Sequence, residues 1–236
     1  MDKTFVFYCI LFILVGEFIL DTVMNYLNAK RFKDPIPNDL NDVYNAQEYE
    51  KSQAYKLSNY KFGIITSTFS LALILGFLFF GGFEWVDEVA FNYTSNTIIQ
   101  ALIFFGIIML GSDILNIPFS YYQTFVIEQK FGFNKTTHKT FLIDKLKQWA
   151  MTIIIGGGIL SLVIWFFQWS GSNFWLYTWG LITIFTLIMN LFYSKLIVPL
   201  FNKQVPLEAG SLKEKIEHYA ASVGFDLQHI FVINGS

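Results

Sequence analysis

The sequence has few of the residues that soluble proteins use to build their surfaces. Charged residues make up 14% of the 236 residues, whereas hydrophobic residues make up 54%. Soluble domains usually contain about 25% charged residues, so a water-soluble globular fold does not suit most of this chain. Cysteine occurs once, as Cys9, which excludes a disulfide framework. Lys and Arg form no dense cluster, so we expect no nucleic-acid partner.

Motifs for catalysis are also missing. The three histidines, His138, His218 and His229, do not form H-E-x-x-H, the spacing that places two zinc-binding imidazoles and a glutamate base on one helix face. No Ser-His-Asp set, Cys-His pair or phosphate-binding loop is recognisable. We expect each histidine at the surface, and the residues by themselves predict no catalytic group and no metal ligand.

What the sequence does contain is a series of long apolar segments, each near the ~20 residues that cross a bilayer as a helix. The five segments cover residues 5–27, 62–83, 98–120, 149–169 and 174–200. We therefore predict an all-α membrane domain over residues 1–202, with five transmembrane helices in contact with the lipid bilayer.

The basic residues are confined to alternate gaps between these segments. The gap before the second segment holds six Lys and Arg residues and the gap before the fourth holds five. The tail together with the end of the fifth segment holds four, Lys195 included, which leaves only Lys3 of the 16 elsewhere. Cytoplasmic loops of membrane proteins accumulate Lys and Arg. The pattern predicts an external N-terminus, cytosolic loops at residues 28–61 and 122–148, and a cytosolic C-terminus.

Several polar residues lie inside the apolar segments. An acidic residue at the bilayer centre costs about 2.5–3.5 kcal/mol on insertion scales, so Asp113 should face protein or water. It would form either a polar site in a cavity or a helix-packing contact, for example with Asn116. Glu17 and Asp21 are four residues apart and share a helix face, which favours a structural or interfacial role.

Two backbone signals interrupt the later segments. Pro118 cannot donate a backbone hydrogen bond, which predicts a kink in the third segment. The triple glycine at residues 156–158 favours close packing of the fourth segment against a neighbouring helix.

The residues after 202 differ in character. Ser211–Glu214 has the capping-box pattern that opens a helix, and Gly224 is typical of a C-terminal helix cap. Residues 230–233 form a short apolar run typical of a buried strand. Because one helix and one strand cannot form a core, we predict that residues 203–236 begin a cytosolic α+β domain that is incomplete in this chain.

Two stretches carry a resemblance to a known family. One runs from Asn116 to Thr136, and the other runs from Leu196 to Gly210 with continuations at 212–217 and 230–236. Together they resemble the type I CAAX prenyl proteases, which are integral-membrane zinc metallopeptidases. The resemblance extends from the first span to the last residue.

The resemblance implies that residues 203–236 are the first helix and strand of a truncated zincin-like domain whose H-E-x-x-H lies beyond Ser236. Zinc is therefore implied in the full-length parent protein and not in these residues. The implied activity is zinc-assisted cleavage of peptide bonds near the C-terminus of protein or peptide substrates, prenylated or not. The chain as given is expected to be inactive.

The resemblance also implies roles for five residues. Asp113 and Asn116 would line the water-filled chamber that the family's spans enclose. Lys135, Pro199 and Asn202 match positions near the junction between membrane and peptidase parts, where an architectural role is expected.

Two other interpretations stay open at this point. A non-catalytic membrane scaffold would have a gene that ends near residue 236. A five-span transporter would contain internal repeats and paired broken helices, and no convincing repeat is present. The absence of a long polar insertion favours a bacterial inner membrane, and the endoplasmic reticulum is expected if the host is a eukaryote.

Overall fold

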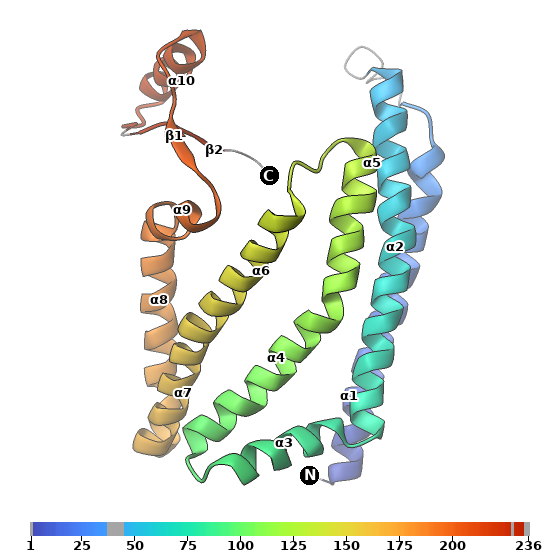
Figure 1. Cartoon of the computed structure of the whole chain (residues 1–236), viewed down its shortest axis with the longest axis vertical. Coiled ribbons are helices and arrows are strands. Elements are labelled where there is room, and N and C mark those ends of the chain that lie inside the picture. The colour runs from blue at the N-terminus through green and yellow to red at the C-terminus, as the bar shows by residue number, and fades with distance from the viewer. Residues whose placement is uncertain (1, 37–44, 228, 234–236) are drawn as a thin grey trace. The chain divides into compact units, whose positions relative to one another are not determined.

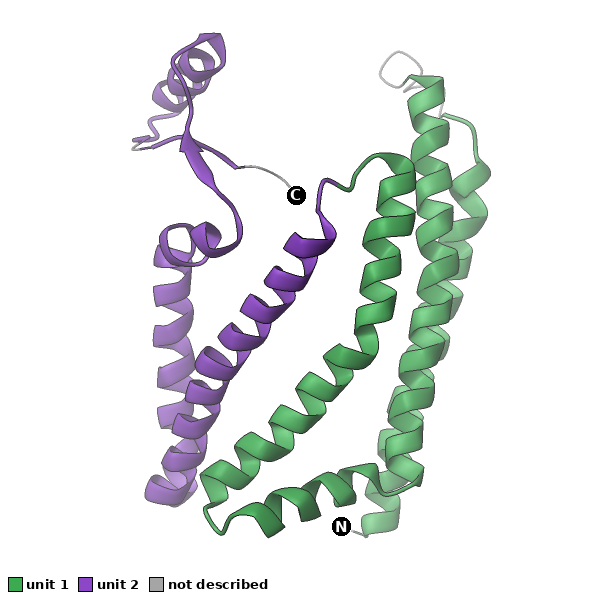
Figure 2. Cartoon of the chain, in the orientation of Figure 1, with its two compact units in different colours: residues 1–134 green, residues 135–236 purple. Residues whose placement is uncertain are grey.

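The described residues are almost entirely helical, with two short strands near the C-terminus (Figure 1). A computed structural model describes residues 2–36, 45–227 and 229–233. The chain divides into two compact units, Met1–Asn134 and Lys135–Ser236 (Figure 2).

The first unit begins with an antiparallel pair of long helices, α1 (Lys3–Lys30) and α2 (Ala46–Phe79). Side chains cap both helices, because Asp2 accepts a hydrogen bond from the Thr4 amide and Asn45 accepts one from the Gln47 amide. Pro35 and Pro37 in the sequence predict that no helix continues through this region. The short 3-10 turn η1 (Arg31–Lys33) extends α1 and ends before Pro35, whereas Pro37 lies outside the described residues.

Helix α2 is much longer than the apolar segment that predicted it. The polar residues 44–60, rich in Glu, Gln, Lys and Tyr, predict a helix against the membrane that leads into the second segment. Tyr44 lies outside the described residues, and residues 46–60 are helical and continue into the span without a break. The 34 residues of α2 extend over about 51 Å, well beyond the ~30 Å hydrocarbon core. The helix is continuous over residues 46–60 because no Gly or Pro interrupts this run of good helix formers.

A short helix replaces the expected outer loop at residues 84–96. Helix α3 (Gly82–Tyr93) lies across the end of α2 (Figure 1), and its Val86 and Ala90 are almost completely buried. Gly81 turns the chain from α2 into α3 at a φ of +68°, a left-handed conformation that glycine adopts at low cost.

The third long helical stretch contains a proline and a π-helical segment, two features that bend helices. Helix α4 (Thr97–Tyr122) includes Pro118 and continues through the π-helical segment η3 (Gln123–Glu128) into the short α5 (Gln129–Phe131). The ribbon bends along this stretch (Figure 1), in agreement with the predicted kink. The expected loop at 122–148 is therefore largely helical, and only residues 132–137 lie outside helices.

The second unit is built on a helical hairpin. Its first arm runs through α6 (His138–Met151), the π-helical segment η4 (Thr152–Gly156) and α7 (Gly157–Ser170). The turn η5 (Gly171–Asn173) reverses the chain, and α8 (Phe174–Leu196) packs against α7.

Gly156 and Gly158 do not serve close helix packing within this unit. A Cβ added at Gly158 would meet no heavy atom within 4 Å, and one added at Gly156 would meet only Thr152 at 4.0 Å. Gly156 is instead the last residue of the π-helical segment η4, and Gly157 begins α7.

Four helical stretches of the described residues are long and apolar enough to cross a membrane: Lys3–Lys33, Ala46–Phe79, Thr97–Phe131 and His138–Leu196. The last has 59 residues and contains both arms of the hairpin, so it accounts for the fourth and fifth predicted segments. The fifth segment was expected to continue to residue 200, but α8 ends at Leu196 and a separate turn, α9 (Val198–Phe201), follows.

A small strand pair closes the described chain. Strand β1 (Gln204–Pro206) pairs antiparallel with β2 (Phe231–Ile233), with Val205 opposite Val232. Helix α10 (Ser211–Ser222) connects them. The strand prediction at 230–233 is confirmed in its position, but its three described residues are exposed rather than buried, because no second layer covers this sheet among the described residues.

The two ends of α10 differ in how well the sequence predicted them. Gly224 adopts a φ of +68°, and the Phe225 and Gly224 amides donate to the Ala220 and Ala221 carbonyls, a complete Schellman motif. The capping box was wrong, because α10 begins at Ser211 itself and its cap residue Gly210 has no side chain to accept a bond.

Candidate functional site

The two predicted chamber residues lie on one face of α4, three positions apart. Both Asp113 and Asn116 are half-buried. The Asn116 amide donates a 2.9 Å hydrogen bond to the Ser112 carbonyl of its own helix. Asp113 also has a partner within the described chain. The arrangement keeps two polar side chains together at a depth where each needs protein or water as a neighbour.

An aromatic cluster fixes the end of this helical stretch onto α2. The Tyr55 ring contacts the Phe131 and Phe133 rings edge-on, with centroid distances of 5.2 Å and 4.9 Å. Gly132 between them has a φ of +82°, which brings both phenylalanines to the same side of the turn. Phe131 is only 6% exposed. We call Tyr55, Phe131 and Phe133 the aromatic clasp.

A polar contact supports the aromatic clasp one helical turn further along α2. The Gln123 amide donates a 2.7 Å hydrogen bond to Asn59 Oδ1, and the Asn59 amide donates to the Tyr55 carbonyl at 3.2 Å. Gln123 is the first residue of η3. Sequence reasoning missed both Tyr55 and Asn59, although their spacing of four on a polar helix segment places them on one face.

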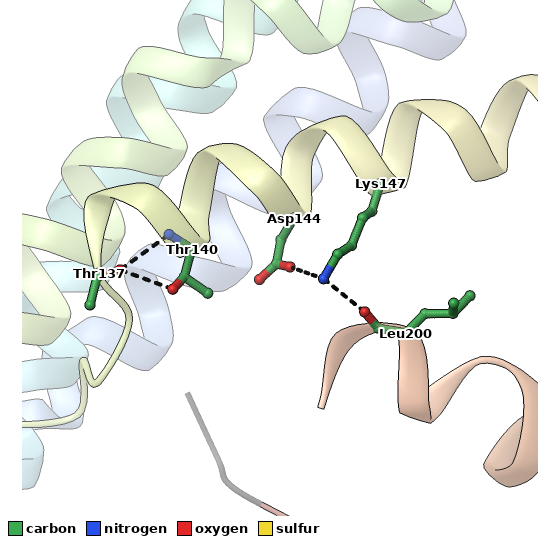
Figure 3. A network of polar contacts seen from close by, with 5 residues as sticks. All are labelled: Thr137, Thr140, Asp144, Lys147 and Leu200. Carbon is green, nitrogen blue, oxygen red and sulfur yellow. Dashed lines mark hydrogen bonds and ion pairs between the residues drawn. The ribbon is translucent and has the colours of Figure 1, made fainter. Parts of the chain in front are cut away.

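The predicted junction residue Lys135 begins the second unit, where it is exposed in the turn before α6. The start of α6 is fixed by Thr137, whose hydroxyl accepts a 3.1 Å hydrogen bond from the Thr140 amide (Figure 3). This cap does not involve Lys135, whose architectural role stays a prediction.

Lys147, one of the basic residues in the gap before the fourth apolar segment, connects α6 to the turn after α8. Lys147 Nζ donates to the Leu200 carbonyl at 2.8 Å and to Asp144 Oδ1 at 3.2 Å (Figure 3). The same ammonium lies 5.6 Å from the centroid of the Phe201 ring. We call these four residues the lysine junction.

The predicted residues Pro199 and Asn202 flank this contact. Pro199 occupies the first turn of α9, where a backbone N–H would have no partner within the helix, so its missing N–H costs little. The Asn202 backbone N–H donates to the Val198 carbonyl at 2.9 Å and closes the turn. Together they hold the short turn in which the Leu200 carbonyl points to Lys147. The structure thus brings Pro199 and Asn202 together with Lys147 in one unit, whereas Asp113 and Asn116 belong to the other.

The histidines do not form a metal site. His138, His218 and His229 are exposed, as predicted, and lie at the start of α6, on α10 and before β2. Within residues 2–36, 45–227 and 229–233, no group of three or more His, Cys, Asp and Glu side chains could hold a metal ion. A zinc site of the usual kind needs three or four such ligands, so the described residues do not fit one.

Comparison with known families gives a match over most of the chain. The family model described as "CAAX prenyl protease N-terminal, five membrane helices" matches residues 25–203. The hairpin in the last apolar stretch explains how four long stretches agree with that description of five helices.

Individual relatives carry the same family name. A CAAX prenyl protease 1 homolog of Oryza sativa is 35% identical over 235 residues, and these cover 96% of this chain and 55% of the relative. A probable CAAX prenyl protease 1 of Schizosaccharomyces pombe is 37% identical, with 94% of this chain and 50% of the relative covered. The chain therefore spans about half the length of these relatives.

The fold agrees with a solved structure. The crystal structure of S. mikatae Ste24p overlaps this chain with a TM-score of 0.87 and 32% sequence identity. The overlap covers 94% of this chain and 54% of that protein.

Proposed function

Since the chain belongs to the CAAX prenyl protease family, we propose that it is the membrane part of a zinc metalloendopeptidase that cleaves near the C-terminus of proteins or peptides, prenylated or not. The observation that carries this proposal is the family match across residues 25–203, which includes four of the five membrane helices and the end of the first. Zinc, when bound to a peptidase of this kind, supplies a Lewis acid for peptide hydrolysis.

The described residues would contribute architecture to this activity, because their donor set does not fit zinc. The lysine junction fixes the turn that leads from α8 into β1, and β1 pairs with β2. We assign residues 203–236 to the start of a cytosolic peptidase part. Zinc ligands and the general base would come from residues other than those described.

The chain is an integral membrane protein by its long apolar helices and its family. We propose an external N-terminus and a cytosolic C-terminus, on the strength of the Lys and Arg distribution. In a eukaryotic host the expected membrane is the endoplasmic reticulum, and in a bacterial host it is the inner membrane.

A chimera tests the proposed function. Residues 1–203 of this chain, joined to the remaining C-terminal part of the Oryza sativa relative, should release the terminal tripeptide from a farnesylated CAAX peptide in reconstituted vesicles. The 236-residue chain alone should not. A chimera that folds, binds zinc and leaves the peptide intact would favour the non-catalytic scaffold.

The same chimera tests the predicted chamber residues. If Asp113 and Asn116 line a water-filled chamber, Asp113→Ala should lower turnover and leave the melting temperature close to that of the parent. If Asp113 instead makes a helix-packing contact, the main effect of Asp113→Ala should be a lower melting temperature. Unchanged turnover together with unchanged stability would show that Asp113 neither lines a functional chamber nor makes a stabilising packing contact.

A further inference from the structure

A cleft with several polar side chains in its lining lies between the C-terminal half of α1, together with η1, and the N-terminal half of α2. The cleft has a volume of about 880 Å³, within the range of sites for small ligands. Its polar lining includes Asp21, Asn25, Asn28, Arg31, Asp34, Gln53 and Lys56. On α1, Asp21, Asn25 and Asn28 recur at spacings of four and three, so they form one polar stripe on that helix.

The depth of these residues follows from the helix register. Phe7 of α1 contacts Phe79 of α2 at a ring centroid distance of 5.7 Å, and the two helices are antiparallel (Figure 1). Arg31 is 24 residues after Phe7, and the residue 24 before Phe79 is Tyr55. Arg31 and Lys56 therefore lie at about the same height on opposite walls of the cleft.

Other groups lie above and below this pair of cations. The same register places Asp34 and Gln53 about one turn nearer the open end of the cleft than the two cations. It places Asn28 and Asn25 one to two turns nearer the closed end. The inner end is lined by Phe18 and Ile64. From the outside inward, the cleft thus presents the Asp34 carboxylate with the Gln53 amide, then the two cations, then the neutral amides of Asn28 and Asn25. The Asp21 carboxylate follows one turn deeper on α1.

The outer polar groups of the cleft lack partners among the described residues. In that part of the chain, Arg31, Asp34 and Lys56 take part in no ion pair. Gln53 Oε1 is buried and accepts no hydrogen bond from a described residue. A buried acceptor without a donor costs about 1–3 kcal/mol, so a ligand that brings an N–H group would remove a penalty that the protein alone leaves.

We propose that this cleft binds the headgroup of a zwitterionic phospholipid with a free ammonium group, such as phosphatidylethanolamine. The phosphate would lie between Arg31 and Lys56, and the ammonium would donate to Asp34 and Gln53 Oε1. The ester carbonyls would accept from Asn25 and Asn28. A net anionic headgroup fits less well because Asp34 opposes it, and a quaternary ammonium cannot donate to Gln53.

Binding can be measured on the full 236-residue chain in detergent by native mass spectrometry. The probes are phosphatidylethanolamine, phosphatidylcholine and phosphatidylglycerol with matched acyl chains. Phosphatidylethanolamine should bind most tightly, and Arg31→Ala with Lys56→Ala should weaken it by roughly tenfold. Lys30→Ala is the matched control, because Lys30 adjoins Arg31 but faces the Tyr26 ring rather than the cleft.

A milder variant tests the ammonium contact and guards against misfolding. Asp34 is exposed, and Asp34→Asn should keep the fold while reversing the preference from phosphatidylethanolamine to phosphatidylglycerol. Equal affinity of the three lipids for the parent chain would overturn the proposal. So would an equal loss in the Lys30→Ala control, or an unchanged preference in Asp34→Asn.

Discussion

At the scale of single residues, the informative contacts are those between a side chain and a distant backbone group. Lys147 reaches the Leu200 carbonyl 53 positions away, and no pattern in the sequence marks that carbonyl as an acceptor. Pro199 and Asn202 could be selected from the family resemblance, but their connection to Lys147 could not. By contrast, the Gly224 cap was predictable because it depends only on local backbone geometry.

Loss of the lysine junction should loosen the turn after α8. We expect Lys147→Ala to lower the free energy of unfolding by about 1 kcal/mol, a modest value because the lysine side chain is 40% exposed. The melting temperature in detergent should fall by about 2–4 °C. Lys139→Ala, on the exposed first turn of α6, should leave it unchanged, and an equal fall in both variants would contradict the role of the junction.

The turn between α2 and α3 should tolerate no side chain at Gly82. A Cβ there would lie 2.5 Å from Phe77 Cδ1 and 3.0 Å from Phe77 Cα, so the backbone itself must shift. Gly82→Ala should destabilise the protein by about 1–3 kcal/mol. Gly76→Ala serves as control, because its Cβ meets nothing within 4 Å and should be neutral or stabilising in chemical denaturation.

At the scale of elements, hydropathy predicted the long helices well and their ends less well. Apolar runs identify what lies in lipid, so all five segments correspond to helices. Hydropathy does not detect a helix that continues beyond an apolar run, so the second apolar segment marks only part of α2. Helix α3 was missed because Glu84, Asp87 and Glu88 conceal the spacing of four between Val86 and Ala90.

The aromatic clasp should hold the turn at residues 132–137 against α2. Tyr55→Ala removes two edge-on ring contacts, worth about 0.5–1.5 kcal/mol each. Amides in this turn should exchange hydrogen with solvent faster, as measured by mass spectrometry. Tyr55→Phe keeps the ring and should exchange like the parent, whereas unchanged exchange in Tyr55→Ala would show that the turn is held by other contacts.

At the scale of the whole molecule, the charge distribution predicts an orientation that labelling can check. In a Cys9→Ser background, Ser95→Cys lies between α3 and α4, and Lys135→Cys lies between α5 and α6. In sealed membrane vesicles whose cytosolic face is outward, a membrane-impermeant maleimide should label Lys135→Cys, and it should label Ser95→Cys only after permeabilisation. The opposite result would reverse the proposed topology. The fold class was predictable from hydropathy and resemblance, whereas this sidedness rests on charge alone.

The uninterrupted length of α2 has a mechanical consequence. Helix α2 contains no Pro and stays unbroken through Gly63, so it should transmit a twist from Ala46 to Ser67 with little loss. A partner bound to the exposed N-terminal turns of α2 would therefore also rotate the α2 side chains that face α1. A partner outside the bilayer could thereby alter what lies between these two helices without touching it.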